Sequence, residues 1–302
     1  MPELPDVEAY LEALRRVAVG HVLERVRIAS PIILRTVDPP IHEAEGKRIR
    51  GVRRIGKRIV LELQDDLYLV VHLMIAGRLH WRPKGTRVPA RVGHAALDLD
   101  DGTLLLTEAN ATKRAALHLV RGREALEGFD RGGIEPLEAD RAVFRAALTR
   151  ESHTLKRALT DPAIFSGIGN AYSDEILHRA RLSPTKLSRA LDGAEVERLW
   201  RATRDVLTEW TERLVAEARE RFPEKVTAFR PEMAVHGRYG KACPSCGSRV
   251  QRVAHAENEA NYCATCQTGG KLLADRALSR LMREDWPRTL AELEERKGTS
   301  RR

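Results

Sequence analysis

The spacing of apolar residues changes near residue 135, and this change constrains the fold more than any other feature of the chain. Between residues 22 and 120, five runs are typical of β-strands: VLERVRI, KRIVLEL, LYLVVHL, AALDL and TLLLTE. The triplets QDD and DDG lie between neighbouring runs and indicate turns. After residue 135, apolar residues recur three and four positions apart, notably over residues 193–221, as in helices. The pattern predicts an α+β protein, with an antiparallel β-sandwich followed by a helical domain.

A further helix is predicted over residues 5–18, ahead of the sandwich. Pro5 suits the first helical position, where its missing N–H leaves no hydrogen bond unmade. Val7, Leu11 and Leu14 then follow at helical spacing. The N-terminal domain should therefore consist of one helix and the sandwich.

Two of the predicted helices of the second half flank a short turn, SGIGN, at residues 166–170. Gly167 and Gly169 allow backbone angles that other residues avoid, and Asn170 is a favourable N-cap for the next helix. Residues 222–242 read as irregular, and the tail is basic and compatible with a helix. We expect domains at 1–134, 135–235 and 236–270, followed by a C-terminal helical extension at 271–302.

The four cysteines are clustered in the third of these segments, in the pattern C-x2-C-x16-C-x2-C. A disulfide framework would join distant segments, so the clustering disfavours one. Two C-x-x-C pairs can supply the four thiolates of one structural zinc ion, with a β-hairpin between the pairs. Four free thiols or an iron–sulfur cluster are the alternatives. The ligands would be Cys243, Cys246, Cys263 and Cys266.

The charge of the chain suggests a polyanionic partner. Its 302 residues carry a net charge of +9, and lysine and arginine displace counterions from nucleic-acid phosphates. A generically basic soluble protein is the alternative. The longest nearly apolar run, LYLVVHLMIAG, is too short to span a bilayer, and the first residues lack a signal-peptide pattern. We expect a cytoplasmic protein, and these features alone leave open a transcription factor or a ribosome-associated protein.

Three segments together carry a resemblance to a known family. PELPDVE at residues 2–8, SGIGNAYSDE at 166–175 and the cysteine pattern resemble the formamidopyrimidine-DNA glycosylase and endonuclease VIII family of bacterial repair enzymes. The resemblance extends from residue 1 to about residue 267. It implies a β-sandwich, a helix–two-turn–helix domain and a zinc finger, in agreement with the residue patterns. It also implies a monomer that acts on double-stranded DNA with damaged bases or abasic sites, in the nucleoid.

The resemblance assigns a catalytic role to residues near the N-terminus. In this family the initiator methionine is removed and the following proline, here Pro2, becomes the nucleophile. An α-amino group titrates near pH 8 and a lysine near 10.4, so much more of the terminal amine is neutral and able to attack a sugar carbon. Glu3 matches the family's catalytic acid, and Lys57 matches a strand lysine near the active site. The implied activity is a DNA glycosylase with AP-lyase activity.

Other matching residues are expected to bind DNA. His72 matches a histidine placed near the DNA backbone, although a lone histidine in an apolar strand is more often a core residue. Asn170 matches an asparagine that binds phosphate, which is compatible with a helix N-terminus. We also place Lys156 among the DNA-binding residues.

The chain departs from the family where a damaged base must be sensed. Enzymes that extrude a nucleotide fill the gap that it leaves. Here Ile75 occupies the position of a gap-filling methionine, with Met74 one position early. In the second gap-filling segment Lys113 and Arg114 are retained, but Ala115 replaces the wedge phenylalanine.

The zinc finger departs as well, because Asn258 stands where the family has a phosphate-binding arginine. Asparagine can bond a phosphate oxygen but lacks the charge and the bidentate fork of arginine. In the extension, Leu273, Ala277, Leu281 and Met282 are expected near one helical face.

We therefore expect a bifunctional glycosylase whose lesion is not fixed by the sequence. The alternative is a non-catalytic, or abasic-site-restricted, damage-binding protein that retains the fold. The Pro2–Glu3 pair favours the enzyme.

Overall fold

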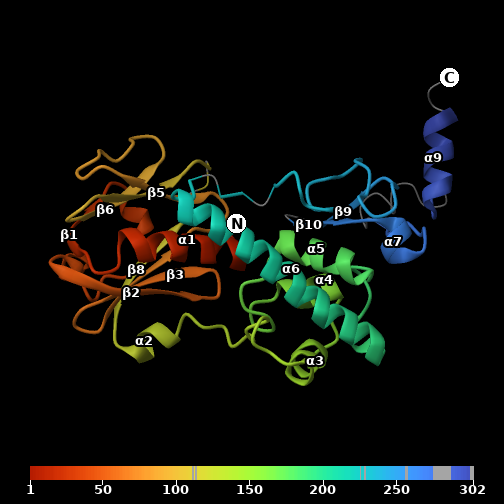
Figure 1. The fold of residues 1–302 in the computed structure, drawn as a ribbon, viewed down its shortest axis with the longest axis horizontal. Coiled ribbons are helices and arrows are strands. Elements are labelled where there is room, and N and C mark those ends of the chain that lie inside the picture. Colours follow the sequence, from red (N-terminus) through yellow and green to blue (C-terminus); the bar gives the residue numbers. More distant parts are fainter. Residues whose placement is uncertain are drawn as a thin grey trace. The chain divides into compact units, whose positions relative to one another are not determined.

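The structure, a computed structural model of the chain, describes residues 1–110, 112, 114–224, 226–227, 229–255, 258–274 and 287–299. The chain divides into two compact units (Figure 1). Unit 1 comprises Met1–Gly132 and Thr208–Thr227, and unit 2 comprises Gly133–Leu207 and Ala228–Arg302. The division falls within the longest helix, α6 (Gly193–Glu220), so residues of this one helix contribute to both units.

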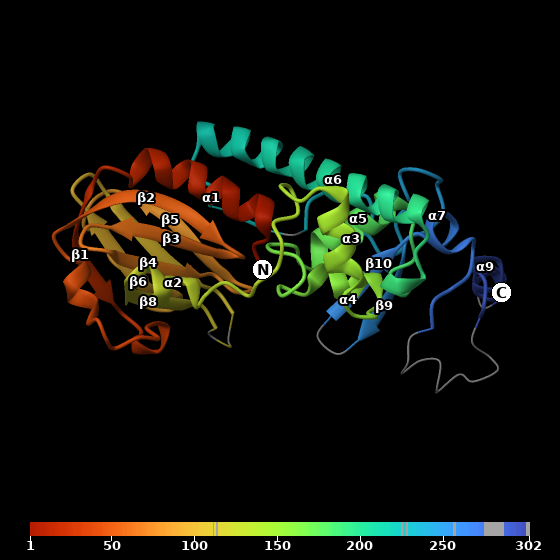
Figure 2. The same cartoon turned by 90° about the horizontal axis from the view of Figure 1, so that it is seen from below.

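Unit 1 is an antiparallel sheet of eight strands with helix α1 (Leu4–Val17) across it (Figure 2). The order of the strands is β5-β7-β6-β1-β2-β3-β4-β8. The register between β1 and β2 covers two residue pairs, so the halves on either side can fold into two layers. The predicted sandwich and its helix are thus confirmed. The strands are β1 (Val22–Ile28), β2 (Lys47–Ile55), β3 (Arg58–Leu63), β4 (Leu67–His72), β5 (Gly77–Arg82), β6 (Gly93–Leu99), β7 (Thr103–Glu108) and β8 (Ala116–Arg121).

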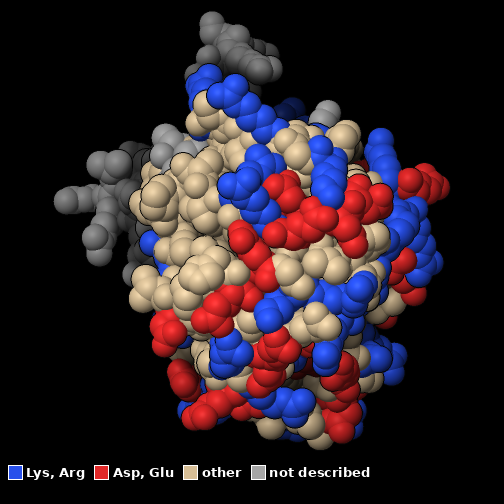
Figure 3. Space-filling model, turned by 90° about the vertical axis from the view of Figure 1, so that its left-hand side faces the viewer, with Lys and Arg blue, Asp and Glu red and all other residues tan. Residues whose placement is uncertain are grey.

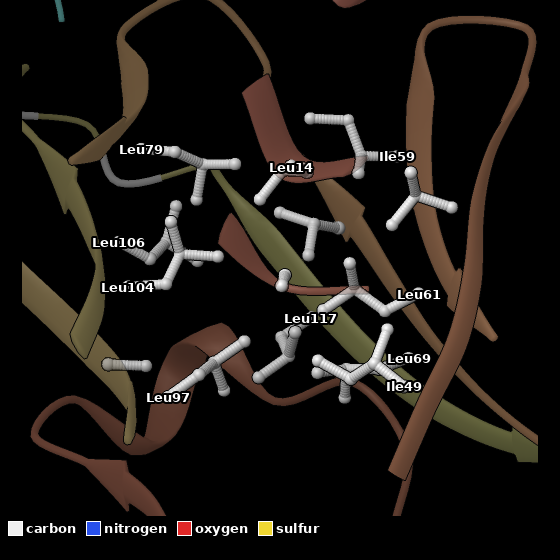
Figure 4. Close-up of a cluster of buried hydrophobic side chains, with 14 of the residues drawn as sticks. Leu14, Ile49, Ile59, Leu61, Leu69, Leu79, Leu97, Leu104, Leu106 and Leu117 are labelled. Atoms are coloured by element: carbon white, nitrogen blue, oxygen red, sulfur yellow. The ribbon is translucent and has the colours of Figure 1, made fainter. Parts of the chain in front are cut away.

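The core of unit 1 lies between the two layers. Leu61 of β3 and Leu69 of β4 face Leu97 of β6 and Leu104 of β7 across the interior (Figure 4). Leu14 of α1 closes the same cluster, and all five side chains are almost fully buried. Burial of such a side chain stabilises the fold by about 1.5–3 kcal/mol, so this cluster is the main source of the unit's stability.

A second, smaller cluster covers the outer face of one layer. Val60, Val70 and Val120 point away from the sandwich interior and pack against Leu126 of α2 (Arg123–Glu127). Because both faces of β3 are covered, its sequence RIVLEL is apolar on both sides. This explains why that strand shows a continuous apolar run and no alternation.

Three strands, β2, β5 and β8, were not among the predicted runs. Their sequences, KRIRGVRRI, GRLHWR and ALHLVR, carry arginine or histidine at positions that face away from the core. In β2 only Ile49 and Val52 are buried. Their pairing with neighbouring strands, rather than their own composition, makes them strands.

The helical part of unit 2 contains α3 (Arg141–Thr149), α4 (Leu155–Thr160), α5 (Asn170–Ala180) and the first part of α6. Asn170 does not occupy the N-cap position that we predicted for it. The helix begins at Asn170 itself, and Gly169 is the N-cap, with extended backbone angles. The Ser173 hydroxyl donates to the Gly169 carbonyl at 2.6 Å, which fixes this first turn from within the helix.

The remaining described part of unit 2 contains a hairpin and helices that follow it. Strands β9 (Gln251–His255) and β10 (Asn258–Tyr262) form the predicted hairpin, and α7 (Ala264–Thr268) follows it. Leu272 and Leu273 lie near the start of the extension, and its last described helix is α9 (Leu290–Thr299). The Leu272 N–H donates to the Arg288 carbonyl at 2.8 Å, so the extension folds back on its own start. Ala277, Leu281 and Met282 lie outside the described residues.

Charges of both signs are mixed over the side of the molecule drawn in Figure 3. Exposed ion pairs of unit 1, such as Arg53 with Glu62 and Lys84 with Glu24, both at 2.7 Å, are typical of such a surface. The net charge of +9 is therefore not concentrated on this side. Among the described helices, none combines the length and the apolar character needed to cross a membrane.

Candidate active site and zinc centre

The first residues of the chain are fixed against unit 1 by the start of α1. Pro2 is buried, and the Glu3 side chain is 3% exposed although it carries a carboxylate. Glu3 is the N-cap of α1 and forms a reciprocal capping box with Asp6, whose Oδ2 accepts the Glu3 N–H at 3.0 Å. A helix N-terminus attracts negative charge, so both carboxylates are stabilised there. The capping box thus fixes Glu3, the residue that follows Pro2, at the start of the helix.

Burial is the main influence that favours a neutral amine at the N-terminus. Burial lowers the pKa of the Met1 α-amino group below its usual value near 8, and the cations Arg78 and Lys57 lower it further. The carboxylates of Glu3 and Asp6 act in the opposite direction. A neutral amine is the nucleophilic form, so this environment suits an amine that must attack carbon. Lys57 lies in the two-residue turn between β2 and β3 and not within a strand.

His72 ends strand β4, opposite Arg58 on one side and Ala116 on the other. Burial lowers the pKa of His72 to about 4, and the nearby cations Arg58 and Lys57 and the imidazole of His118 add to this effect. The imidazole is therefore neutral near pH 7. A neutral imidazole can still donate one N–H to a phosphate oxygen, but it adds no charge to such a contact.

The turn from β4 to β5 presents Ile75 to solvent. Met74 has a φ of +50°, in the left-handed region that residues other than glycine rarely adopt, and Ile75 is 50% exposed. The Gly77 N–H closes the turn onto the Leu73 carbonyl at 2.8 Å. A Cβ at Gly77 would lie 2.2 Å from that carbonyl oxygen, so the turn requires glycine there. The turn is tight, and its tip is apolar.

The loop between β7 and β8 is anchored by a buried pair that the sequence reasoning missed. Glu108, which is 1% exposed, accepts the N–H of Arg114 at 2.9 Å and of Ala115 at 3.2 Å, and it contacts His94 at 3.2 Å. Ala115 is 3% exposed and belongs to the core of unit 1. The side chain at the position of the family's wedge is thus buried in the protein. Arg114 is exposed, and Lys113 lies outside the described residues.

In unit 2, Lys156 and Asn170 are brought together by a buried carboxylate. The Lys156 ammonium donates to Asp174 Oδ1 at 2.5 Å and to the Asn170 carbonyl at 2.6 Å. Asp174 Oδ2 lies 2.8 Å from His236 Nδ1 and accepts from Asn261 at 3.3 Å. The Lys156 side chain is only 15% exposed, and its bond to the Asn170 carbonyl holds the first turn of α5.

Glu175 provides a second anchor beside Asp174. Its carboxylate accepts the backbone N–H groups of Ala234, Val235 and His236 at 2.7–2.9 Å. Burial raises the pKa of Glu175, while these three donors oppose that effect. Asp174 and Glu175 thus connect α5 to the segment before the zinc finger. They were overlooked because acidic residues in a helix usually face solvent, and only SGIGNAYSDE as a motif drew attention to them.

The four cysteines meet the geometric requirement for one zinc ion. Their sulfur atoms all lie within 4.8 Å of one another, with Cys246 and Cys263 at 3.4 Å and Cys243 and Cys266 at 4.0 Å. Tetrahedral zinc with bonds near 2.3 Å places its sulfur ligands about 3.8 Å apart. His178 of α5 lies with Nε2 3.3 Å from the Cys243 sulfur, as an outer hydrogen-bond partner of a thiolate would. All four ligand positions are supplied by protein, so the ion is structural.

Asn258 is the first residue of β10 and pairs with His255 across the hairpin. Its side chain is outside the part of the chain that the structure describes. The predicted phosphate contact of Asn258 therefore stays a prediction.

Three family models match the chain in order. They are the formamidopyrimidine-DNA glycosylase N-terminal domain over residues 1–112, the H2TH domain of the same enzymes over 133–216, and the zinc finger found in FPG and IleRS over 240–269. The first covers α1 and the sandwich through β7, and the second covers the helices around SGIGN. The third contains all four cysteines.

Several relatives match over nearly their whole length. The formamidopyrimidine-DNA glycosylase of Thermus thermophilus is 36% identical over 279 residues, which are 89% of this chain and 100% of the relative. That of Heliobacterium modesticaldum is 35% identical, covering 88% and 100%. The crystal structure of the Thermus thermophilus Fpg protein aligns with a TM-score of 0.74 at 34% identity, over 88% of this chain and 98% of that one.

A Lactococcus lactis FPG variant in complex with Fapy-dG-containing DNA aligns with a TM-score of 0.77 at 25% identity, over 88% of this chain and 100% of that one. The alignments with these relatives cover 88–89% of this chain. On this basis the chain belongs to the formamidopyrimidine-DNA glycosylase family.

Proposed function

We propose that this DNA glycosylase of base-excision repair uses the nitrogen of Pro2 as its nucleophile and Glu3 as its acid. The observation that carries the proposal is the buried Pro2–Glu3 pair at the start of α1, in surroundings that lower the pKa of the terminal amine. Removal of Met1 would make that amine belong to Pro2. No other described group combines such a position with a motif of the family.

The chemistry follows from a secondary amine at this position. Glu3 protonates O4′ of the damaged nucleotide's sugar, the bond from C1′ to O4′ breaks and the proline nitrogen bonds to C1′, losing its proton. The bond from C1′ to the base then breaks, the base leaves with that electron pair and takes up a proton, and a cationic iminium remains between proline and C1′. That cation withdraws electrons, so the flanking phosphates can be eliminated in turn. This lyase step is known for the family.

The DNA contacts are assigned to both units. His72 and Ile75 of unit 1, and Asn170, Lys156 and Asn258 of unit 2, are proposed to bind a double-stranded substrate with a damaged base or an abasic site. We assign Lys57 to the phosphate at the lesion, and Lys113 and Arg114 to the neighbouring backbone. The protein would act as a monomer on the bacterial nucleoid.

One observation favours a narrower activity as second candidate. Ala115 lies in the core, so the loop from 109 to 115 offers no aromatic wedge among its described residues. Ile75 is 50% exposed and can enter a base stack as an apolar wedge, but it is smaller than an aromatic ring. An enzyme restricted to abasic sites, where no base must be extruded, would suit such a surface.

Blocking the nitrogen of Pro2 tests the nucleophile. One residue inserted between Met1 and Pro2 converts that nitrogen into an amide, which is not basic and cannot form an iminium. We expect the mature wild-type protein to begin at proline by mass spectrometry and to give a borohydride-trapped adduct with abasic DNA. The insertion variant should give no adduct while it keeps most of its DNA affinity. A Lys57→Met variant serves as comparison. Persistence of the adduct after insertion, and its loss in Lys57→Met, would make Lys57 the nucleophile.

Replacing the acid separates the two steps. Glu3→Gln keeps the amine but removes the proton donor, so base excision should fall about 100-fold or more, as is typical of a lost general acid. Lyase activity on preformed abasic sites should fall less. Glu8→Gln, on the same helix, is the matched control and should retain both activities. Equal loss of both activities in Glu3→Gln, measured by single-turnover kinetics, would contradict an acid role in base release.

The lowered pKa of His72 predicts a pH dependence of stability. In the unfolded chain His72 titrates near 6.5 and in the folded chain near 4, so the unfolded state binds more protons between these values. The folded state therefore loses stability as the pH falls from 6.5 toward 4, by about 2 kcal/mol between pH 7 and pH 5. Urea unfolding at the two pH values should show a smaller loss for His72→Gln than for wild type. The exposed His42→Gln should behave as wild type, and an unchanged pH dependence in His72→Gln would mean that His72 is solvated.

Removing one cysteine tests the zinc centre. Cys243→Ser should lose bound zinc and much of the DNA affinity, because the four ligands fold a local segment, while the sandwich of unit 1 stays folded. Ser245→Ala, between the first two cysteines, is the control and should retain one zinc per chain. Metal analysis and circular dichroism provide the measurements. Iron in the purified protein, or full activity without metal, would overturn the assignment.

A further inference from the structure

Phe229 of unit 2 is an aromatic side chain that the fold leaves open to solvent. Its side chain is 68% exposed, the largest value among the described aromatic residues. The next, Tyr239, is 49% exposed. A large apolar ring in water is unfavourable compared with a covered one, so the exposure needs a reason.

The ring is held in place from beneath. The imidazole of His236 stacks on it with 5.6 Å between ring centroids and 21° between planes. His236 is 5% exposed, and its Nδ1 lies 2.8 Å from the buried Asp174 carboxylate. The His236 N–H is also held by Glu175 at 2.8 Å. Phe229 therefore rests on a side chain that two buried carboxylates fix.

The backbone beside the ring is shaped to admit it. Gly237 has a φ of +67°, and a Cβ there would lie 2.7 Å from the Phe229 ring. Any side chain at Gly237 would both strain the backbone and displace the ring. The Arg238 guanidinium donates to the Pro231 carbonyl at 2.8 Å and closes the intervening segment. The segment from 229 to 238 thus presents one face of an aromatic ring in a defined position.

Cationic side chains accompany this face. Arg230 follows Phe229 in the chain, Arg238 follows Gly237, and Arg252 of β9 lies over the ring of Tyr239 at 4.6 Å. Exposed aromatic rings interleaved with arginine are the surface that binds single-stranded nucleic acid, because every base has a flat face and every nucleotide has a phosphate. Such a surface needs no particular base.

We propose that the exposed face of Phe229 stacks on an unpaired nucleobase of the DNA substrate. This inference rests on the proposed function, because extrusion of a nucleotide unstacks both the damaged base and the base opposite it. Neither the turn with Ile75 nor the described part of the loop with Ala115 supplies an aromatic ring. Phe229 supplies one from another part of the chain. The ligand is a nucleobase that has lost its stacking neighbours. It can be the extruded base, the base opposite the lesion or a base of a single strand.

The test compares variants of the full-length protein in DNA binding. Phe229→Leu keeps an apolar side chain but removes the π face, and Phe229→Trp keeps the face. Gly237→Ala leaves Phe229 in place but displaces its ring. Val143→Ala, which trims a 46%-exposed side chain on α3, is the control for loss of an exposed apolar group. Binding is measured to undamaged duplex, to duplex with a tetrahydrofuran abasic analogue and to a single strand.

Phe229→Leu and Gly237→Ala should bind the abasic duplex and the single strand about fivefold to 100-fold more weakly than wild type. Undamaged duplex should bind all variants alike, and Phe229→Trp and Val143→Ala should match wild type throughout. A 2-aminopurine probe locates the stacked base. The probe is placed in turn opposite the analogue, at a mismatched target position and in the single strand. The placement at which wild type, but not Phe229→Leu, quenches the fluorescence identifies the stacked base.

Equal affinity of Phe229→Leu and wild type for all three DNAs, with no change in probe fluorescence, would overturn the proposal. Borohydride trapping of the same variants separates this failure from failure of the proposed function. If wild type forms the adduct and Phe229→Leu binds all three DNAs as wild type does, only the stacking proposal is refuted. If wild type forms no adduct but Phe229→Leu binds the single strand more weakly than wild type, the proposed chemistry is refuted and the stacking proposal stands.

Discussion

The buried carboxylate of Asp174 is the interaction on which the arrangement of unit 2 depends. It is 1% exposed, and a charge in such a place is costly unless it is paired and hydrogen-bonded. Lys156 from α4, His236 from the segment before the finger and Asn261 from β10 all meet it. Four segments that are far apart in sequence are thereby held at one point. Loss of one partner would leave this buried charge with fewer compensating contacts.

Unit 1 is organised differently, because a large apolar core supports a few polar groups at its edge. The sandwich buries leucines from both layers, and α1 closes it with Leu14. The start of that helix carries the Pro2–Glu3 pair, so the position of the amine is set by core packing many residues away. His72 and Ile75 lie at and just beyond the end of β4, whose middle is in the same core.

The sequence predicted the fold well wherever one local pattern decides the outcome. The helix at the N-terminus, the five apolar strands and the hairpin between the cysteine pairs were all found. Strands such as β2 were not, because KRIRGVRRI becomes a strand only through its partners. For the site, motifs indicated the cysteines and the Pro2–Glu3 pair. Glu108, whose carboxylate anchors backbone N–H groups of a loop, has no sequence signal, since its role exists only after the chain has folded.

In the turn that carries Ile75, the backbone path is fixed while the side chain at the tip is not. Gly77 leaves no room for a Cβ, and the bond from its N–H to Leu73 fixes the backbone path whatever side chain stands at the tip. Met74 occupies a left-handed conformation that would cost glycine nothing, so the turn holds its shape even against the preference of its own residue. A tip residue can then be exchanged during evolution without moving its neighbours. Under the proposed function, the apolar group that this turn offers to DNA can change one side chain at a time while the backbone of the turn keeps its path.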